Sequence, residues 1–438
     1  MLKKNAFLQG TILLTAAGVI TRIIGFFYRI FLSRVMGEEG MGIYQLLSPV
    51  MAITFSLSCS GIQTAISKHV ASYHVKKQNS ACLHILLTGL SLSMSLSAIT
   101  ACILYRYDNW IAVNLLLEQR CAPLVRIFAL SVPFSSLHAC INGYYYGLKK
   151  AFFPSFTQLA EQVTRVGCVF LIYMIGISRG RQVSLSVAML GILAGEICST
   201  LISAVAIYCH FYKLLPLQKM AAPHFVLHIR ELLQMAVPLS ANRLVLNGLQ
   251  SIEAVYIPNK LMQYGMTNSK ALGCYGVLTG MALPLLLFPT ALTSSISVLL
   301  LPYISEAQAQ KDAVKIRNAI KRCVSYCLLL GSACCIFLLL FGDFLGNFLF
   351  DSSLAGSYIR MLSIVCPVLY LGSVLTSILH GLGKAFTAFL YNSICLLVRL
   401  LFVFLLIPVF GMPAYLLGIF ISQLLFTVLM LRTLCRFR

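Results

Sequence analysis

Charged residues are scarce in this sequence, and acidic residues are the scarcest of them. Only 10% of the residues are charged, with 12 Asp and Glu against 33 Lys and Arg, whereas a soluble domain carries about 25%. Hydrophobic residues make up 59% of the chain, and the mean hydropathy is +0.89. This composition excludes an ordinary soluble domain and indicates a protein of the lipid bilayer, with room for about twelve spans of some twenty residues each.

The sequence also lacks the common motifs of enzyme and metal chemistry. Its 16 cysteines are scattered through apolar segments, without a CxxC pair or a Cys/His cluster at ligand spacing, so we predict neither a metal site nor disulfides. No GxxxxGK[ST] loop for phosphate binding occurs, and the loops are too short for a soluble catalytic domain. We therefore expect no catalytic residues and no cofactor. The formal charge of +21 is explained by anionic lipids and membrane orientation, and we expect no nucleic-acid partner.

Hydrophobic runs bounded by charged residues, Gly or Pro predict an all-α, polytopic membrane protein with about twelve transmembrane helices. The predicted spans cover residues 8–33, 43–66, 82–105, 124–148, 152–176, 185–211, 231–256, 273–301, 320–341, 357–380, 386–410 and 413–432. If the N-terminus is cytoplasmic, roughly 19 Lys and Arg lie inside and roughly 9 outside. We therefore expect a multi-pass protein of the cell membrane with both termini in the cytoplasm, whose first span is not a cleaved signal.

Landmark residues of the first half return in the second half at a constant offset of about 234 residues, which indicates a duplicated unit. The recurring pairs are Pro133 and Pro367, Gly147 and Gly381, Lys150 and Lys384, and Arg165 and Arg399. Six spans per copy make the copies parallel, so we expect two six-helix lobes around a central cavity. We place the N-terminal lobe at 1–212, a cytoplasmic linker at 213–230 and the C-terminal lobe at 231–438.

Polar residues inside the predicted spans fall on shared helix faces, as in the fifth span, where Glu161 and Arg165 have the spacing of an ion pair. An arginine at the centre of a span costs about 2.5–3.5 kcal/mol, so such residues should face a hydrated interior. That interior would be net cationic, which suits an anion such as phosphate. The residues that we predict to bind substrate are Arg22, Arg29, Arg165, Arg243, Arg399, Glu161, Gln158 and Asn247.

Single residues of this set have structural alternatives. Glu161 and Arg165 could form a self-neutralising structural pair, and Arg29 could extend its side chain to the outer interface. We expect His138 and His380 to be packing or interfacial residues rather than proton relays.

Several short segments form an ordered set along most of the chain. They are Thr21–Arg29 (TRIIGFFYR), Gly40–Gln45 (GMGIYQ), Gln158–Arg165 (QLAEQVTR), Gly195-Glu196, Ala236–Leu239 (AVPL), Tyr275–Pro284 (YGVLTGMALP) and Pro302–Ala307 (PYISEA). This set resembles the lipid-linked oligosaccharide flippases of the multidrug/oligosaccharidyl-lipid/polysaccharide exporter superfamily. More specifically, it is similar to the stage V sporulation protein B group of polysaccharide biosynthesis proteins.

The resemblance implies two six-helix lobes around a V-shaped cavity. It also implies movement of an undecaprenyl-pyrophosphate-linked sugar or muropeptide from the inner to the outer leaflet, and for the sporulation group export of peptidoglycan precursors for the spore cortex. Arg22 and Arg29 match the cationic first-helix residues that contact the pyrophosphate in peptidoglycan flippases. The expected partners are this anionic lipid-linked saccharide and membrane lipids, with the coupling ion left open. This chain departs from those relatives in two features. They have about fourteen spans, whereas we predict about twelve here, and their eighth span contains an arginine that this chain lacks.

Two other functions were weighed against this one. A cation-coupled multidrug exporter of the same fold needs intramembrane carboxylates, and the excess of arginine argues against it. A membrane-embedded polymerase or ligase of sugar lipids needs catalytic carboxylates or a long external loop, and the sequence shows neither.

Overall fold

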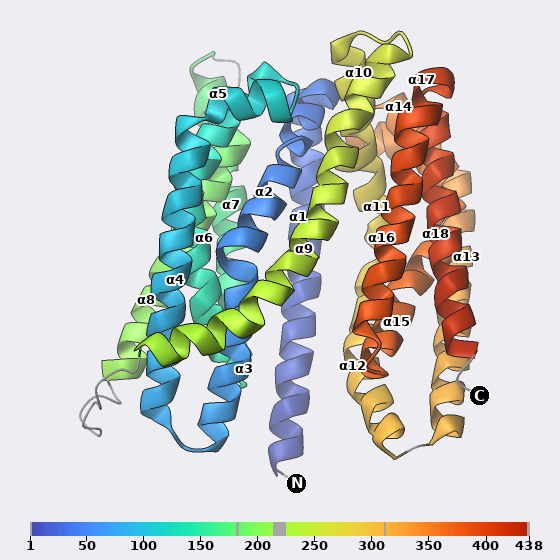
Figure 1. Ribbon diagram of the computed structural model, residues 1–438. Helices are drawn as coiled ribbons and strands as arrows, with labels where there is room; N and C mark the ends of the chain where they lie inside the picture. Colours follow the sequence, from blue (N-terminus) through green and yellow to red (C-terminus); the bar gives the residue numbers. More distant parts are fainter. Residues whose placement is uncertain (1, 181–183, 213–224, 311, 436–438) are drawn as a thin grey trace. The chain divides into compact units, whose positions relative to one another are not determined.

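The computed structural model describes residues 2–180, 184–212, 225–310 and 312–435, and these ranges are helices joined by short turns, with no β-strand (Figure 1). The predicted all-α, polytopic class is confirmed. Ten of the described helices are long and apolar enough to span a bilayer. The count is eleven if α14 (Ser353–Ser363) and α15 (Cys366–Gly381), which meet at 63°, form one bent span.

The predicted count of about twelve spans exceeds this number because of α9 (Phe225–Gln263). At 39 residues α9 is long enough to cross a bilayer. However, a stripe of polar residues that includes Arg243 and Asn247 lowers its hydropathy below that of the other spans.

The chain forms two compact units. Unit 1 contains Met1–Tyr28 and Leu46–Gly248, and unit 2 contains Arg29–Gln45 and Leu249–Arg438. The division therefore falls inside α1 (Leu2–Gln45) and inside α9, and not at the predicted linker 213–230. Residues 213–224 of that linker lie outside the described ranges. Helix α9, with 39 residues, extends about 58 Å at 1.5 Å per residue, which is long enough for it to belong to both units. Helix α1 is interrupted at Gly37, whose φ of 68° and ψ of −177° are not helical.

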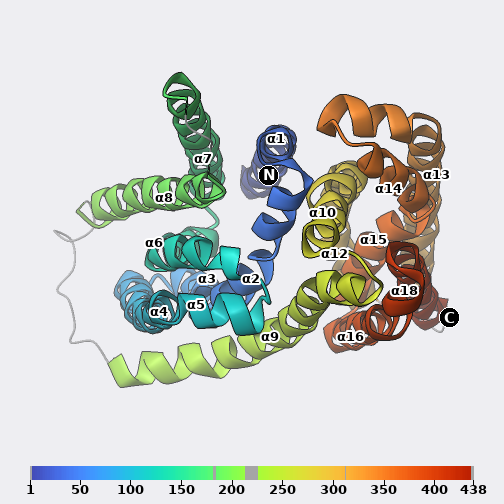
Figure 2. The ribbon, with the colours of Figure 1, turned by 90° about the horizontal axis from the view of Figure 1, so that it is seen from above.

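Unit 1 is built around α6, which packs against α3, α4 and α8, while α7 packs against α8 (Figure 2). Its further elements are α2 (Ser48–Phe55), η1 (Ser56–Ser60), α3 (Gly61–Val75), α4 (Asn79–Arg106), α5 (Asp108–Trp110), η2 (Ile111–Leu115), η3 (Gln119–Cys121), α6 (Ala122–Gly147), α7 (Phe152–Ser178) and α8 (Ser186–Tyr212). The core contains Ile66, Val70, Ile85, Ile141 and Tyr144, all at most 3% exposed. Burial of these apolar side chains holds α3, α4 and α6 together.

Small residues let α6 approach α3 closely. A Cβ atom added at Gly143 would lie 2.6 Å from the carbonyl oxygen of Gln63, and one at Gly147 would lie 2.7 Å from that of Ser67. Both distances are far inside van der Waals contact, so only glycine allows these backbones to meet. In a membrane, such close packing replaces the hydrophobic effect as the force between helices.

Unit 2 is built around α15, which packs against α12, α13 and α18, and α18 also packs against α16. Its further elements are α10 (Asn268–Gly276), η5 (Val277–Ala282), α11 (Leu283–Leu287), α12 (Thr290–Ala309), α13 (Ala313–Phe350), α16 (Ala385–Leu401), η6 (Phe402–Leu406), α17 (Ile407–Phe410) and α18 (Met412–Cys435). Its core includes Ile304, Leu371, Val374 and Ile378, all at most 3% exposed.

Side-chain caps define where several helices of unit 2 begin. Thr267, Asp312 and Ser352 precede α10, α13 and α14, and each side chain accepts a hydrogen bond from the backbone N–H three residues later. Such caps satisfy amide groups that the first turn of a helix leaves without partners. The sequence thus fixes these helix starts locally.

The turns that join α6 to α7 and α15 to α16, which lie at the predicted repeat offset, share one hydrogen-bond pattern. The backbone N–H groups of residues 148, 149 and 150 bond to the carbonyls of residues 144, 146 and 145. Residues 382, 383 and 384 bond in the same pattern to residues 378, 380 and 379. Lys149 and Gly383 both have a positive φ, of 59° and 71°, which is the left-handed conformation that commonly ends a helix. Helices α3 and α9 end in the same way, at Lys77 and Gly265, so the pattern is a common helix end and the duplication stays a prediction.

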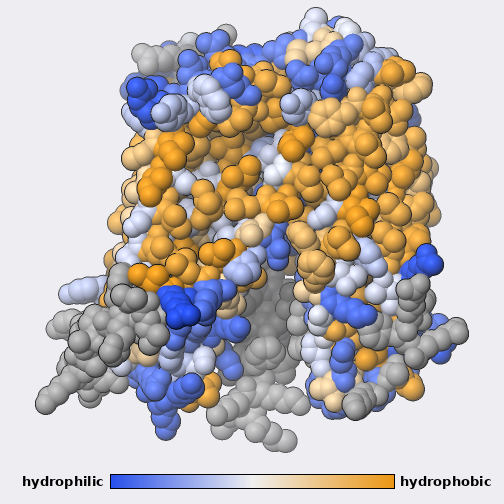
Figure 3. Space-filling model, in the orientation of Figure 1, coloured by the Kyte–Doolittle hydropathy of each residue, from blue (hydrophilic) through white to orange (hydrophobic). Residues whose placement is uncertain are grey.

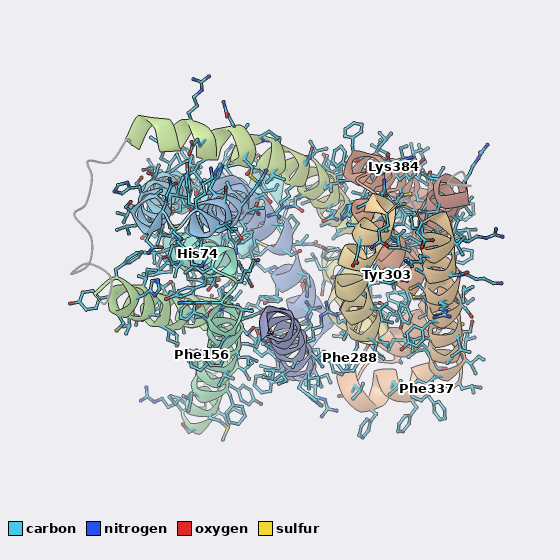
Figure 4. The ribbon with its side chains drawn as sticks, turned by 90° about the horizontal axis from the view of Figure 1, so that it is seen from below. His74, Phe156, Phe288, Tyr303, Phe337 and Lys384 are labelled. Atoms are coloured by element: carbon cyan, nitrogen blue, oxygen red, sulfur yellow. The ribbon has the colours of Figure 1, made fainter. Side chains whose placement is uncertain are left out.

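Hydrophobic side chains cover the middle of the visible face of each unit, and hydrophilic ones gather toward the ends of the helices (Figure 3). Large apolar side chains remain exposed, such as Phe156 of α7 and Phe337 of α13 at 49% and 52%, both labelled in Figure 4. Large apolar faces on a soluble monomer are rare, but lipid covers them in a membrane protein.

Candidate functional site

Unit 1 holds a cluster of four ionisable side chains from three adjoining helices. His138 comes from α6, Glu161 and Arg165 from α7, and Glu196 from α8. Arg165 donates a hydrogen bond to Glu161, as their spacing predicted. His138 lies between the two carboxylates, with Nδ1 3.1 Å from Glu196 Oε2 and Nε2 4.0 Å from Glu161 Oε2. The side chains of both glutamates and of His138 are only 13–15% exposed.

Two glycines four residues apart, Gly191 and Gly195, bring α8 close to α7 at this cluster. Cβ atoms added at Gly191 and Gly195 would lie 3.0 and 2.9 Å from the carbonyl oxygens of Arg165 and Glu161. The α8 backbone therefore rests directly on the turn of α7 that carries both charged residues. Glu196 follows Gly195 in sequence, so this contact brings its carboxylate next to that of Glu161.

The cluster of unit 1 is not fully satisfied by hydrogen bonds. His138 Nδ1, Glu196 Oε2 and Arg165 Nε are buried and have no hydrogen-bond partner among the described residues, although the first two atoms are within ion-pair distance of each other. Buried polar atoms are nearly always paired, and an exception at a cluster of charges points to function. His138, which we expected to be a packing or interfacial residue, therefore contacts two carboxylates.

Unit 2 contains a second buried cluster, around Arg399 of α16. Arg399 donates to Glu253 Oε2 on α9, and the hydroxyl of Tyr415 on α18 donates to Glu253 Oε1 at 2.8 Å. Glu253 and Tyr415 are 4% and 5% exposed. Both carboxylate oxygens of Glu253 thus have a partner, and the charges of the pair cancel.

The predicted substrate residues fall into two groups. Arg165, Glu161 and Arg399 lie in the two buried clusters, whereas Arg22, Arg29, Arg243 and Gln158 are exposed on α1, α9 and α7. Asn247 belongs to neither group. It donates to Ala52 O at 3.2 Å and to Ser56 Oγ at 2.8 Å, where α2 passes into the π-helical turn η1.

Four members of these clusters lie outside the predicted set of substrate residues, namely His138, Glu196, Glu253 and Tyr415. No spacing rule within one helix brings α6, α8 and α7 together, because helix packing alone decides such contacts.

Comparison with known proteins identifies the family. The family described as "Polysaccharide biosynthesis protein" matches residues 7–308. Stage V sporulation protein B of Bacillus subtilis (strain 168) is 30% identical over 437 residues, which cover 97% of this chain and 83% of that protein.

Two solved structures share the fold of this chain. A multidrug resistance MATE family transporter of the MOP superfamily, in an inward-facing conformation, aligns with a TM-score of 0.73 at 14% identity over 96% of this chain and 98% of its own. Lipid II flippase MurJ, in an inward closed conformation, aligns with a TM-score of 0.72 at 17% identity over 96% of this chain and 87% of its own. The chain therefore belongs to the polysaccharide biosynthesis protein family, and it is a multi-pass membrane protein whose fold is shared by these two solved structures.

Proposed function

We propose that this transporter is a flippase for an anionic lipid-linked saccharide. The substrate class is an undecaprenyl-pyrophosphate-linked saccharide or a peptidoglycan precursor, which is moved from the inner to the outer leaflet. The relative named stage V sporulation protein B and the fold shared with a protein titled lipid II flippase support this class. In a spore-forming cell, the product would serve synthesis of the cell wall or of the spore cortex.

The observation that carries the proposal is the exposure of arginines on the apolar helix α1 and on α9. Arg165 and Arg399 are bound to carboxylates, but Arg22, Arg29 and Arg243 are exposed. Each would cost about 2.5–3.5 kcal/mol if it faced acyl chains at the centre of the bilayer. A hydrated surface that receives an anion removes that cost, and the planar guanidinium group is suited to phosphate oxygens.

Transport follows an alternating-access cycle between the two predicted lobes. The pyrophosphate headgroup meets the exposed arginines from the cytoplasmic leaflet while the prenyl tail stays in lipid. Binding favours the outward-open state only to the extent that this state binds the headgroup more tightly. Moving an anion out of a negative interior is aided by the membrane potential, at about 2.3 kcal/mol per charge per 100 mV.

The orientation with both termini in the cytoplasm is part of the proposal. It puts the basic turns α3–α4, α6–α7 and α15–α16 on the cytoplasmic side, in line with the positive-inside rule. Figure 4 labels Lys384 in the last of these turns, seen from below.

A reconstituted assay tests the function directly. Purified protein in liposomes is given labelled undecaprenyl-pyrophosphate lipids, and flipping is scored by the accessibility of the label in each leaflet. We expect flipping by the wild type and its loss in Arg29→Gln and Arg243→Gln. Arg106→Gln, at the exposed end of α4, is the matched control and should flip normally. Unchanged flipping in all three variants would remove the arginines from the site.

A second candidate is a cation-coupled multidrug exporter. The buried carboxylates of Glu161 and Glu196 favour it, as does the fold shared with a multidrug resistance transporter. The same liposomes decide between the two candidates, because efflux of a cationic dye without lipid flipping would establish the exporter and refute the flippase.

A further inference from the structure

Each buried cluster contains one arginine of the recurring pair, Arg165 in unit 1 and Arg399 in unit 2. The two clusters differ in net charge. In unit 2, Arg399 faces a single carboxylate, and both oxygens of Glu253 are hydrogen-bonded. In unit 1, Arg165 bonds to one carboxylate, and a second carboxylate, Glu196, lies nearby with a buried oxygen that lacks a hydrogen bond. Unit 1 therefore carries one more negative charge than its arginine can balance.

This excess belongs to only one copy of the repeat. At the repeat offset, the positions of His138 and Glu161 are taken by Gly372 and Cys395 in unit 2. Helix α18, the last helix of unit 2, contains no Asp or Glu. The imidazole and the second acid are thus additions to a shared framework, and structural stability of the repeat does not require them.

One proton balances the charges of unit 1. With Arg165 cationic, both carboxylates ionised and His138 neutral, the cluster has a charge of −1. A proton on the imidazole brings the sum to zero. The resulting imidazolium would direct Nδ1–H toward Glu196 Oε2, at 3.1 Å, and Nε2–H toward Glu161 Oε2, at 4.0 Å. His138 Nδ1 and Glu196 Oε2 are buried and have no hydrogen-bond partner among the described residues. The same proton would let them form a hydrogen bond with each other.

The donor set suits a proton better than a metal ion. Alkali and alkaline-earth ions prefer shells of oxygen ligands, whereas one of the three groups here is an imidazole, and Arg165 already occupies one carboxylate. A divalent transition metal would accept imidazole, but it would bring a net positive charge beside the guanidinium group. The thiol of Cys59 on η1 also lies within electrostatic range of Glu196, and a buried thiol is inert.

We propose that His138, Glu196 and Glu161 form a binding site for one proton, present in unit 1 alone, and that its loading drives the transport cycle. The second half of this statement rests on the proposed transport function. The site is tied to the packing of its three helices. Glu161 and Arg165 lie under the GxxxG contact of α8, and Thr200 of α8 donates to the carbonyl oxygen of Phe134, one turn before His138, at 2.8 Å. A change of charge here alters the attraction among α6, α7 and α8.

The site itself is tested without any substrate. Nitrogen NMR of protein with labelled histidine, in lipid nanodiscs, reports whether each ring nitrogen carries a proton, and the His138 signal is assigned by its loss in His138→Gln. In a titration from about pH 5 to pH 9 we expect a doubly protonated His138 that loses one proton as the pH rises, since histidine is the side chain that switches charge near neutral pH, and a changed titration in Glu196→Gln. His210→Gln, on the same unit but bonded to Tyr144, should leave the His138 signal unchanged. A single neutral tautomer of His138 over the whole range would overturn the proposal.

The coupling is tested in the flipping assay. For one proton per cycle, a gradient of one pH unit is worth 1.36 kcal/mol and should shift the steady-state ratio of lipid between leaflets about tenfold. We expect that shift in the wild type and in His210→Gln, and none in His138→Gln. A full shift in His138→Gln, or an equal shift by a Na⁺ gradient at constant pH, would refute proton coupling through this site. Absence of flipping under every gradient would instead refute the flippase, and the NMR titration would still decide the proton site.

Discussion

The ion pair between Glu253 and Arg399 should be among the most important polar interactions for the stability of unit 2. In Glu253→Gln the side chain keeps its size but loses its charge, so the guanidinium group of Arg399 stays buried without a counter-charge. The side chains alone of Arg399 and Glu253 are 20% and 6% exposed, so water cannot replace the lost carboxylate. Removing one partner of a buried pair costs about 3–5 kcal/mol. The variant Glu253→Gln should therefore be strongly destabilised.

The expected change is large enough to measure by thermal unfolding. For a body of about 200 residues, each kcal/mol lowers Tm by about 2–4 °C, so the fall should be about 6–20 °C. Unfolding can be followed by the reaction of native cysteines with a fluorogenic maleimide. Cys327 and Cys366 are fully buried, so their thiols react only when the protein unfolds. The control is Asp343→Asn, which breaks a pair with Arg360 whose side chains are 53% and 52% exposed. Exposed pairs contribute at most about 1 kcal/mol.

A double variant separates the pair from its surroundings. Glu253→Gln combined with Arg399→Gln removes both charges, so no unpaired charge remains buried. Its Tm should lie above that of Glu253→Gln alone, since the two residues are in contact and their effects are not additive. The reasoning fails if Glu253→Gln costs no more than Asp343→Asn, or if the double variant is as unstable as the sum of the single ones.

Three further predictions follow from other contacts. Gly195→Val should abolish transport and lower Tm, because its Cβ would lie 2.9 Å from a carbonyl oxygen of α7, whereas Gly167→Ala, with no atom within 4 Å, should be tolerated in both assays. Asn247→Ala should lower stability by about 1–3 kcal/mol, read from unfolding midpoints, because it removes two hydrogen bonds at the start of η1. In a cysteine-free background, a membrane-impermeant maleimide on intact cells should label Asn114→Cys and spare Gln78→Cys, both at exposed positions; the reverse pattern would invert the proposed orientation.

The sequence predicted the parts of this structure that depend on local periodicity. Hydrophobic runs predicted the helices, which the described residues form. The pair of Glu161 and Arg165 was also predictable, since residues four apart on a helix face the same side. In each case the information lies within one helix or one turn.

Contacts between helices were not predictable in this way. Arg399 was expected to resemble Arg165, but α16 has Cys395 at the position that Glu161 has in α7. The carboxylate that pairs with Arg399 belongs to Glu253, 146 residues away in sequence. Such a partner is set by the rotation and depth of two packed helices, which hydrophobic patterns leave open. For the same reason the boundary of the compact units, which falls inside α1 and α9, could not be derived from the composition of a loop.

The clusters also change how the arginines of this chain should be interpreted. A mid-span arginine was taken as evidence for an anion, yet Arg165 and Arg399 each have a carboxylate as their anion. Duplicated arginines therefore mark a structural pair that both copies retain, and residues found in only one copy mark function. By that criterion the exposed Arg22, Arg29 and Arg243 and the unit 1 additions His138 and Glu196 are the positions where substrate and proton should act. Transport by the double variant Glu253→Gln with Arg399→Gln, if it still folds, would be expected on this interpretation, and loss of substrate binding in that variant would contradict it.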